Sequence, residues 1–333
     1  MCILRISQLD LPAPLVVVVG PTAVGKTNLV LDLALRTGGE IVSADSRLFY
    51  RGMDIGTAKP TPEELAQVPH HLIDVANPDE PWGLAVFQRA ASSVIADIQA
   101  RDRLPFLVGG TGQYIWSVIQ AWEIPPQAPD AAMRVALENW ANQVGPFGLH
   151  ERLARLDPQA ASAIDARNVR RTIRALEVIF RTGLRFSAQR QRAVSPYSLL
   201  VIGLTRPRAE LYRRVDDRIE NMLAAGFVRE VRGLLEKGYS PDLPTLSAIG
   251  YREIVAYLQG RCSLDEAIVQ MKRLTRRYVR QQSNWFSLKD PQIHWLDAGP
   301  HSSDAAEALI RSRSAWILPG TTQSKFSGEI FAQ

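Results

Sequence analysis

Short apolar runs alternate with helical patterns in the first third of the chain. The run at 15–19 has the length of a strand, β-branched side chains and no polar alternation, which is typical of a parallel strand covered on both faces. Two further strands are predicted at 40–43 and 105–108, with a helix over 27–36 that ends before Gly38. Because strands that alternate with helices indicate right-handed crossovers, the sequence predicts an α/β fold with a doubly wound parallel sheet.

The pattern changes in the middle of the chain. After a proline-rich stretch, several helical patterns follow one another without an intervening strand, and a strand pattern returns at 198–204. A helical domain inserted into an α/β core is the simplest interpretation. The predicted parts are a discontinuous core of residues 13–121 and 199–299, a helical insertion at 122–198, and a tail at 300–333 that is a candidate disordered segment.

The first predicted strand leads directly into a phosphate-binding motif. Residues 20–27, called the phosphate loop below, match GxxxxGK[ST] between a strand and a helix, so a chance glycine-rich turn is disfavoured. Backbone N–H groups and the helix N-terminus attract phosphate oxygens, and the lysine adds a full positive charge. The candidate diphosphate-binding residues are Gly20, Pro21, Thr22, Ala23, Val24, Gly25, Lys26 and Thr27. The Thr27 hydroxyl can bind Mg²⁺, which is the expected cofactor. Together with the predicted parallel sheet, the motif indicates a P-loop NTPase-like α/β fold with a helical insertion domain.

The sequence lacks an obvious aspartate for nucleotide hydrolysis. Proteins that hydrolyse ATP or GTP place an acid after a second apolar strand, where it holds the metal. Here the strand at 105–108 ends in Gly109 and Gly110, and Asp74 is only a weaker substitute. This pattern disfavours a hydrolase.

Asp45 is a candidate for proton transfer. It follows the strand at 40–43, and ligands of doubly wound sheets bind beyond the carboxyl ends of the strands, so Asp45 should face the same cleft as Lys26. A carboxylate there could accept a proton or hold Mg²⁺ through water. A helix N-cap is an equally good interpretation from spacing alone.

The residues after the second strand carry the most specific signal. Segment 43–60, SADSRLFYRGMDIGTAKP, resembles the signature of the tRNA dimethylallyltransferases, also called tRNA isopentenyltransferases. The resemblance covers roughly residues 14–298 and continues through shorter segments at 70–74, 108–114, 174–178 and 248–253. It implies that the phosphate loop binds dimethylallyl diphosphate rather than ATP. The exocyclic N6 amine of the adenosine 3′-adjacent to the anticodon of a tRNA then attacks the allylic carbon, and diphosphate leaves.

The resemblance also implies roles for single residues. Asp45 matches the general base for the amine, and Thr22, Lys26 and Thr27 match contacts to diphosphate and metal. In the family an arginine from the helix around 211–222 reaches the diphosphate, and the candidates are Arg214 and Arg218. The implied tRNA-binding residues are Asp45, Ser46, Arg47, Leu48, Thr111, Arg170, Arg171, Arg174, Gly250, Tyr251, Arg252, Gln281, Gln282 and Trp285.

Basic residues are concentrated in two segments. Residues 150–192 hold ten arginines and four acids, a balance of +6, whereas the whole chain has a net charge of +5. In the helix predicted there, Ile173 and Phe180 share an apolar face and the arginines lie on another. Segment 267–289 has five basic residues between 272 and 280, no acid, and a following Trp285. Both patterns suit a nucleic acid, although a solvated helix face, with Glu177 pairing to its neighbours, explains the first nearly as well.

Two segments depart from the family pattern. The family usually has His-Pro-Asn-Asp where this chain has Asp-Ala-Arg-Asn at 165–168. It commonly has Arg-Gln-x-Thr-Trp-x-Arg where this chain has Gln-Gln-Ser-Asn-Trp-Phe-Ser at 281–287, so two basic positions and a threonine are replaced. We expect these departures to affect tRNA affinity rather than the reaction.

Composition excludes several classes of protein. With 333 residues and 46% hydrophobic residues the chain can bury a core, and its two cysteines cannot form a disulfide framework. No apolar run is long enough for a membrane span, and we expect a cytoplasmic protein. We also expect it to be a monomer. Three alternatives to the tRNA enzyme remain: an isopentenyltransferase that acts on free adenine nucleotides, a P-loop kinase, and a non-enzymatic RNA-binding module.

Overall fold

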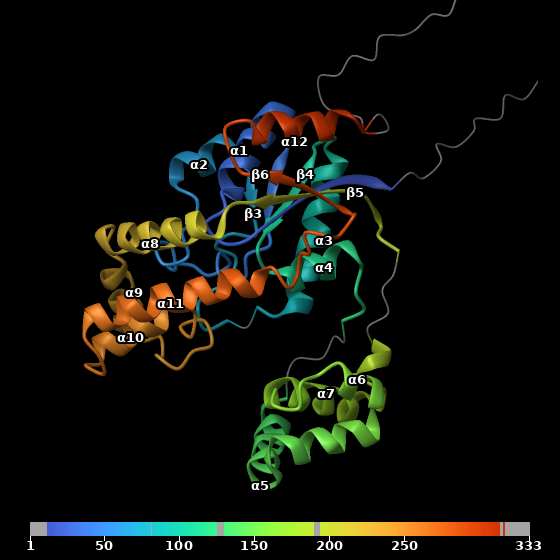
Figure 1. Ribbon diagram of the computed structural model, residues 1–333, viewed down its shortest axis with the longest axis vertical. Helices are drawn as coiled ribbons and strands as arrows, with labels where there is room; N and C mark the ends of the chain where they lie inside the picture. The colour runs from blue at the N-terminus through green and yellow to red at the C-terminus, as the bar shows by residue number, and fades with distance from the viewer. Residues whose placement is uncertain (1–11, 81, 125–129, 190–193, 314–315, 317–333) are drawn as a thin grey trace, which may run out of the picture. The chain divides into compact units, whose positions relative to one another are not determined.

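The computed structural model describes residues 12–80, 82–124, 130–189, 194–313 and 316. The chain divides into two compact units. One contains the residues up to Ile119 together with those from Ser195 onward, and the other is Gln120–Val194 (Figure 1). Among its described residues the inserted unit contains helices and turns but no strand, where the sequence predicts a helical insertion at 122–198.

The larger unit is built on a parallel sheet of six strands, in the order β3-β2-β4-β1-β5-β6. The expected α/β class with a doubly wound parallel sheet is confirmed. Four of the strands match predicted runs: β1 (Ala13–Val19), β2 (Glu40–Ser43), β4 (Pro105–Gly109) and β5 (Tyr197–Thr205). The edge strands β3 (His70–His71) and β6 (Ile293–Asp297) were not predicted.

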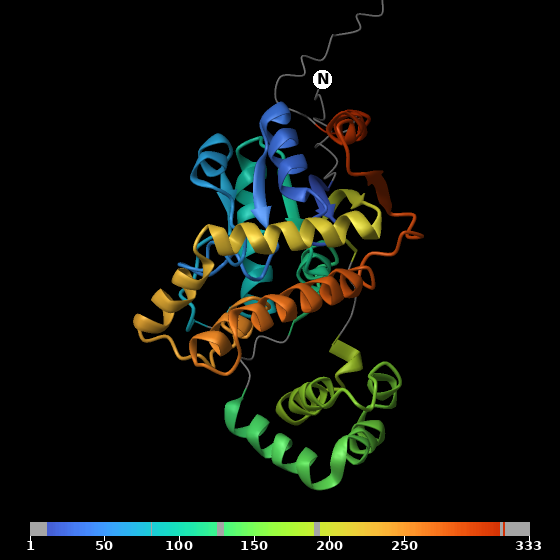
Figure 2. The same cartoon turned by 60° about the vertical axis from the view of Figure 1, so that its left-hand side comes forward.

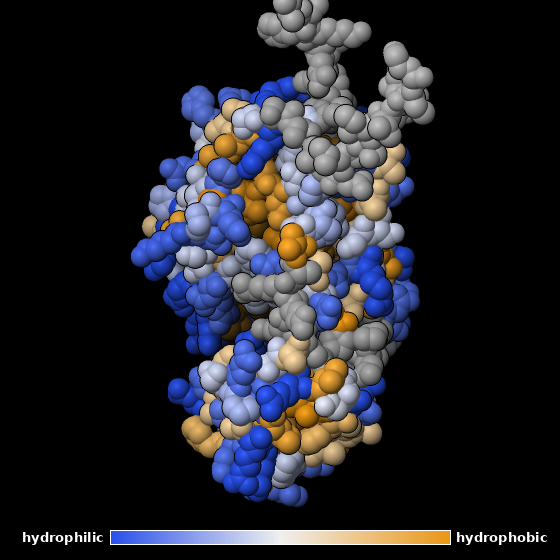
Figure 3. Space-filling model, turned by 90° about the vertical axis from the view of Figure 1, so that its right-hand side faces the viewer, coloured by the Kyte–Doolittle hydropathy of each residue, from blue (hydrophilic) through white to orange (hydrophobic). Residues whose placement is uncertain are grey.

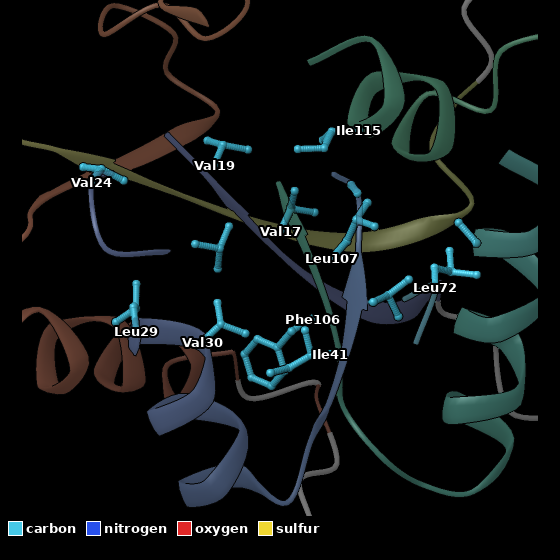
Figure 4. Packing of buried hydrophobic residues seen from close by; sticks show 14 of the residues in the cluster. Val17, Val19, Val24, Leu29, Val30, Ile41, Leu72, Phe106, Leu107 and Ile115 are labelled. Carbon is cyan, nitrogen blue, oxygen red and sulfur yellow. The ribbon is translucent and has the colours of Figure 1, made fainter. Parts of the chain in front are cut away.

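Helices cover the sheet because its central strands are apolar on both sides. In β1, residues 15–19 are completely buried. Helix α1 (Lys26–Thr37) ends at Gly38 in the left-handed conformation, as its sequence predicts, and α3 (Leu84–Ala100) and α4 (Gly112–Ile119) also pack on the strands. Figure 4 shows Phe106 and Ile41 of the sheet beside Val30 of α1.

A second helical group follows β5 in the same unit. Its members are α8 (Arg208–Ala224), α9 (Phe227–Glu236), α10 (Tyr251–Leu258) and α11 (Leu264–Gln282), and a short α2 (Pro62–Gln67) precedes β3. Helices α8 and α11 lie side by side (Figure 2). Ion pairs join them, with Lys272 Nζ 2.7 Å from Glu220 and Arg276 paired to Asp216. Two of the five basic residues in segment 272–280 therefore hold the helices together.

The tail prediction was wrong for residues 302–311. They form α12 (Ser302–Arg311), whose Ala306 and Ile310 are fully buried in the core of the larger unit. Arg36 of α1 also pairs with Asp304 at 2.7 Å and with Glu307 at 3.0 Å. The apolar spacing of this one short helix was too weak a signal beside the polar residues that follow it. Residues 314–315 and 317–333 lie outside the described part of the chain.

The inserted unit has its own core. It contains α5 (Ala131–Leu156), which kinks at Gly145 before Pro146, α6 (Pro158–Ser162), α7 (Val169–Thr182) and a short 3₁₀ turn at Ser187–Gln189. Ile173 of α7 is buried as predicted, but Phe180 is 48% exposed. The packed stripe continues through Ile179 instead. Figure 3 shows apolar and charged residues interspersed on one face of this unit.

Candidate active site

Parallel pairing brings three loops to one edge of the sheet. Val19 at the end of β1 is paired with Gly109 of β4, and Val108 of β4 is paired with Ser43 of β2. The segments that follow these strands are the phosphate loop, the turn that begins at Asp45, and the turn at Gly110. Because the strands end at the same edge, residues far apart in the sequence converge there, as the doubly wound arrangement predicts.

The phosphate loop has the backbone conformation of an anion-binding turn. Gly20 has a φ of 147°, and a Cβ at this position would lie 2.8 Å from the carbonyl oxygen of Leu204, so only glycine fits. Gly25 precedes the first turn of α1 and has a φ of 112°. The Lys26 ammonium donates hydrogen bonds to the carbonyls of Gly20 and Pro21, each at 2.9 Å. Its charge is thereby held over the loop.

Burial changes the acidity of Lys26. It lowers the pKa of this ammonium to about 8, while the nearby Asp45 carboxylate opposes the shift and the positive charge of Arg218 adds to it. Lys26 and Asp45 therefore interact electrostatically, which agrees with the predicted common cleft. The Asp45 carboxylate accepts a hydrogen bond from the backbone N–H of Arg47 at 3.0 Å and stabilises a turn. No helix begins at this turn, so the N-cap interpretation was wrong.

A cavity of about 210 Å³ lies beside these residues. One part of its lining is polar and includes Thr22, Asp45, Ser46, Arg47 and Arg218. Another part is apolar and consists of Val215, Ile219, Met222, Phe227, Ala248, Ile249 and Met271. The cavity thus combines cationic groups and a carboxylate with a surface that suits a small hydrocarbon group.

Both candidate arginines of α8 contact the site. Arg214 donates a hydrogen bond to the carbonyl of Ala23 at 2.8 Å and is exposed. Arg218 lines the cavity and donates to the carbonyl of Thr57 at 3.1 Å. Burial lowers the pKa of the Arg218 guanidinium, and the Asp45 carboxylate opposes this. Arg214 therefore holds the phosphate loop from outside, and Arg218 is the arginine that faces the cavity.

Glu230 is an important residue that sequence reasoning missed. Its carboxylate accepts hydrogen bonds from the backbone N–H groups of residues 54, 55 and 56, at 2.9, 2.6 and 3.1 Å. It also accepts one from the Tyr251 hydroxyl at 2.7 Å. These bonds fix the loop that leads to Thr57 and so to Arg218. The sequence around Glu230 reads as an ordinary amphipathic helix and carries no signal of this role.

Two residues implied to bind tRNA are instead buried. The side chain of Tyr251 is fully buried, with its hydroxyl on Glu230. Gln282 is only 4% exposed, and its amide binds the backbone of Thr22 and of Gly110. These side chains pack between segments of the protein, although Tyr251 also lines the cavity, and their contacts with tRNA stay predictions.

The other implied tRNA-binding residues of the larger unit are accessible to different degrees. Ser46, Arg47 and Gly250 line the cavity. Leu48 and Thr111 are partly buried. The Thr111 side chain interacts with the Tyr278 hydroxyl, which lowers the pKa of Tyr278. Burial and the negative charge of Asp45 have the larger effect and raise this pKa. At the surface lie Arg252, Gln281 and the 43% exposed Trp285.

The arginines of α7 differ in their surroundings. Arg170 and Arg171 are exposed. Arg174 pairs at 2.8 Å with Glu177, which is fully buried and also accepts hydrogen bonds from Arg134 and from the backbone N–H of Asp130. Glu177 pairs with Arg174, as it would on a solvated helix. Its carboxylate is nevertheless buried and joins α7 to α5 and to the residue before α5 within the inserted unit.

Asp74, the weaker candidate for a metal-binding aspartate, takes part in an ion pair. Its carboxylate lies 2.5 Å from the ammonium of Lys59, which also pairs with Asp54 and donates to the carbonyl of Tyr50. Within the part of the chain that the structure describes, no three or more His, Cys, Asp or Glu residues are grouped to hold a metal ion. In those same ranges no helix has the length and apolar character of a membrane span.

Comparisons with known proteins identify similar chains. The family described as IPP transferase matches residues 48–289, and the family described as isopentenyl transferase matches residues 13–77. A tRNA dimethylallyltransferase of Roseiflexus sp. (strain RS-1) is 55% identical over 304 residues, which are 91% of this chain and 99% of that protein. One from Thermomicrobium roseum is 50% identical over 85% of this chain and 86% of its own length.

Solved structures show the same similarity. The tRNA isopentenylpyrophosphate transferase of Bacillus halodurans is 44% identical, with a TM-score of 0.66 over 90% of this chain and 94% of that one. A eukaryotic dimethylallyltransferase captured while acting on tRNA is 26% identical, with a TM-score of 0.74 over 90% of this chain and 77% of that chain.

The pKa of Lys26 predicts a pH dependence for anion binding. With a pKa of about 8, Lys26 is charged at pH 7 and mostly neutral at pH 9, so the dissociation constant for inorganic diphosphate should rise roughly tenfold between these values. Lys26→Arg keeps its charge over this range. Titration calorimetry on both proteins gives the ratio of their dissociation constants, in which the ionisation of diphosphate itself cancels. A ratio that does not change with pH would contradict the assignment.

Proposed function

Because the chain belongs to the tRNA dimethylallyltransferase family, we propose that its cavity binds the reacting ends of both substrates of that family's reaction. The protein transfers a dimethylallyl group from dimethylallyl diphosphate to the N6 amine of the adenosine 3′-adjacent to the anticodon, and diphosphate is released. One observation carries the assignment of the cavity: Lys26, Arg218 and the Asp45 carboxylate are grouped beside an apolar pocket.

The diphosphate leaving group fits the cationic end. As the allylic carbon–oxygen bond breaks, negative charge grows on the diphosphate oxygens, so fixed positive charges stabilise the transition state more than the ground state. Lys26 and Arg218 supply full charges, and the start of α1 supplies backbone N–H groups. Thr22 adds a hydroxyl at the cavity wall. Arg214 supports these groups through the carbonyl of Ala23.

Asp45 is suited to remove the proton of the adenosine amine. The nitrogen lone pair forms the new bond to carbon, the electrons of the broken carbon–oxygen bond leave with diphosphate, and one N–H proton passes to the Asp45 carboxylate. This carboxylate lines the cavity and is oriented by the backbone N–H of Arg47. A positioned base of this kind contributes about 10²- to 10⁴-fold to a rate.

The dimethylallyl group fits the apolar lining. Val215, Ile219 and Met222 follow one face of α8, and Phe227 and Met271 complete the surface. Burying the methyl groups of the substrate there is favourable by about 25 cal/mol per Å² of apolar surface. The same side chains exclude water, which would otherwise capture the allylic carbon and hydrolyse the donor.

The donor set of the site fits Mg²⁺. This ion prefers oxygen ligands and is usually bound by one or two protein groups together with substrate phosphates. The phosphate loop offers the Thr27 hydroxyl, and oxygens of the diphosphate would supply further ligands. When bound, the ion neutralises part of the diphosphate charge. We also propose that the protein acts as a monomer.

Replacing Asp45 tests the base. Asp45→Asn keeps the size of the side chain and an oxygen for the Arg47 N–H, but it removes the proton acceptor. We expect turnover to fall by roughly 10² to 10⁴ with little change in the affinity for dimethylallyl diphosphate. Asp97→Asn, on the exposed surface of α3, is the matched control and should behave as wild type. Turnover of Asp45→Asn close to wild type would remove the role.

The exposed arginines of α7 are expected to bind the tRNA backbone. Replacing Arg170 and Arg171 with Gln should raise the Michaelis constant for tRNA and reduce the slope of log affinity against log salt by up to about one unit per lost phosphate contact. The Michaelis constant for dimethylallyl diphosphate should stay the same, because the phosphate loop belongs to the other unit. Arg174 is left intact because it neutralises buried Glu177.

The control for this experiment is Arg155→Gln, which also removes an exposed arginine from the inserted unit. Its salt dependence should stay close to that of the wild type. If the double variant instead has the same tRNA affinity and a parallel salt dependence, Arg170 and Arg171 belong to a solvated helix face.

A further inference from the structure

Gln282 connects the end of α11 to two loops of the active site. It is the last residue of the helix and is 4% exposed. Its side-chain oxygen accepts a hydrogen bond from the backbone N–H of Thr22 at 2.8 Å, and its side-chain nitrogen donates one to the carbonyl of Gly110 at 3.1 Å. Thr22 lies just before α1, and Gly110 lies just after β4. A single side chain thus satisfies backbone groups from two distant parts of the chain.

The chemistry of these partners requires a carboxamide. A backbone N–H needs an acceptor and a backbone carbonyl needs a donor, and the amide of glutamine supplies one of each. The opposite orientation of the amide would place donor against donor and acceptor against acceptor. An apolar side chain would leave a buried N–H and a buried carbonyl unpaired, which is costly.

The space around the amide is tightly filled. A Cβ at Gly110 would lie 2.3 Å from the Gln282 nitrogen and 3.4 Å from the carbonyl oxygen of Gly20. Glycine at position 110 is therefore needed for the amide to reach between the two loops. Tyr278, one turn earlier on α11, lines the cavity, and its hydroxyl interacts with the Gln282 side chain, which lowers the pKa of Tyr278.

These contacts fix the phosphate loop from two sides. Lys26 holds the carbonyls of Gly20 and Pro21, while Gln282 holds the N–H of the next residue, Thr22. Two consecutive peptide groups, Gly20–Pro21 and Pro21–Thr22, are thereby oriented before any substrate is bound, and the second is held at both its carbonyl and its N–H. Thr22 itself lines the cavity. Pre-orientation of this kind avoids reorganisation of the loop as charge develops on a leaving group.

We propose that Gln282 is a positioning residue for the diphosphate leaving group, acting through Thr22 and not through contact with RNA. This inference rests on the proposed function, since it assumes that the phosphate loop holds a diphosphate. It also gives a structural reason for a glutamine at the end of a helix whose neighbouring positions, Gln281 and Ser283, are exposed. Loss of the amide is expected to loosen the loop without changing the surface that tRNA meets.

The test compares Gln282→Met with the control Gln270→Met. Methionine has nearly the same shape as glutamine and removes both hydrogen bonds of Gln282, whereas the control changes an exposed glutamine of the same helix. For Gln282→Met we expect binding of inorganic diphosphate, measured by calorimetry without tRNA, to weaken roughly tenfold or more. The kcat/KM for dimethylallyl diphosphate should fall at least as much, and the KM for tRNA should stay within twofold of wild type.

Other outcomes would overturn the proposal. A raised KM for tRNA with unchanged diphosphate binding would make Gln282 an RNA contact. A lower kcat with wild-type diphosphate affinity and both KM values unchanged would mean a smaller active fraction, and hence a merely structural role. If Gln282→Met does not fold, Gln282→Glu serves instead: it keeps an acceptor for Thr22 but loses the donor to Gly110. This variant should also bind diphosphate at least tenfold more weakly, and wild-type affinity would contradict the inference.

The proposed function can fail separately from this inference. If the wild-type protein transfers no dimethylallyl group to tRNA, the function is wrong whatever Gln282 does. If the wild type is active and both Gln282 variants bind diphosphate as it does, only the role of Gln282 is wrong.

Discussion

The parallel pairing of β4 with both β1 and β2 is the constraint on which the site depends. It places the residues after Val19, Ser43 and Gly109 at one edge of the sheet, although they are separated by long stretches of chain. The strands can pair in this way because their apolar residues are covered on both faces by helices. Without that pairing, Lys26 and Asp45 would be unrelated charges on two loops.

The same edge creates an electrostatic environment suited to transfer. A lysine whose pKa is lowered by burial lies near a carboxylate and an arginine, and an apolar lining adjoins them. Such a site favours the departure of an anion and the removal of a proton within one small volume. The strand that would carry a metal-binding aspartate in a nucleotide hydrolase ends in glycines, and Asp74 is paired with Lys59. The cavity therefore differs from the site of a nucleotide hydrolase at the position of the metal-binding aspartate.

Patterns within short segments of the sequence predicted the elements whose conformation depends on those same segments. Apolar runs located the four inner strands of the sheet, and the glycine-rich motif located the phosphate loop. The two-residue β3 has no pattern to detect, and the buried face of α12 is only two residues wide. The resemblance implied a different role for Gln282, and Glu230 was missed, because their backbone partners Thr22 and Ile55 lie 260 and 175 positions away and backbone groups leave no mark in the sequence.

The account is tested most directly by supplying the protein with dimethylallyl diphosphate labelled in the hydrocarbon group, together with tRNA, AMP and ATP in one reaction. Digestion of the recovered tRNA and chromatography of the nucleosides then locate the label. The account predicts label on N6 of an adenosine in tRNA, released diphosphate, unlabelled AMP and intact ATP. Label on AMP, or hydrolysis of ATP without transfer to tRNA, would contradict it.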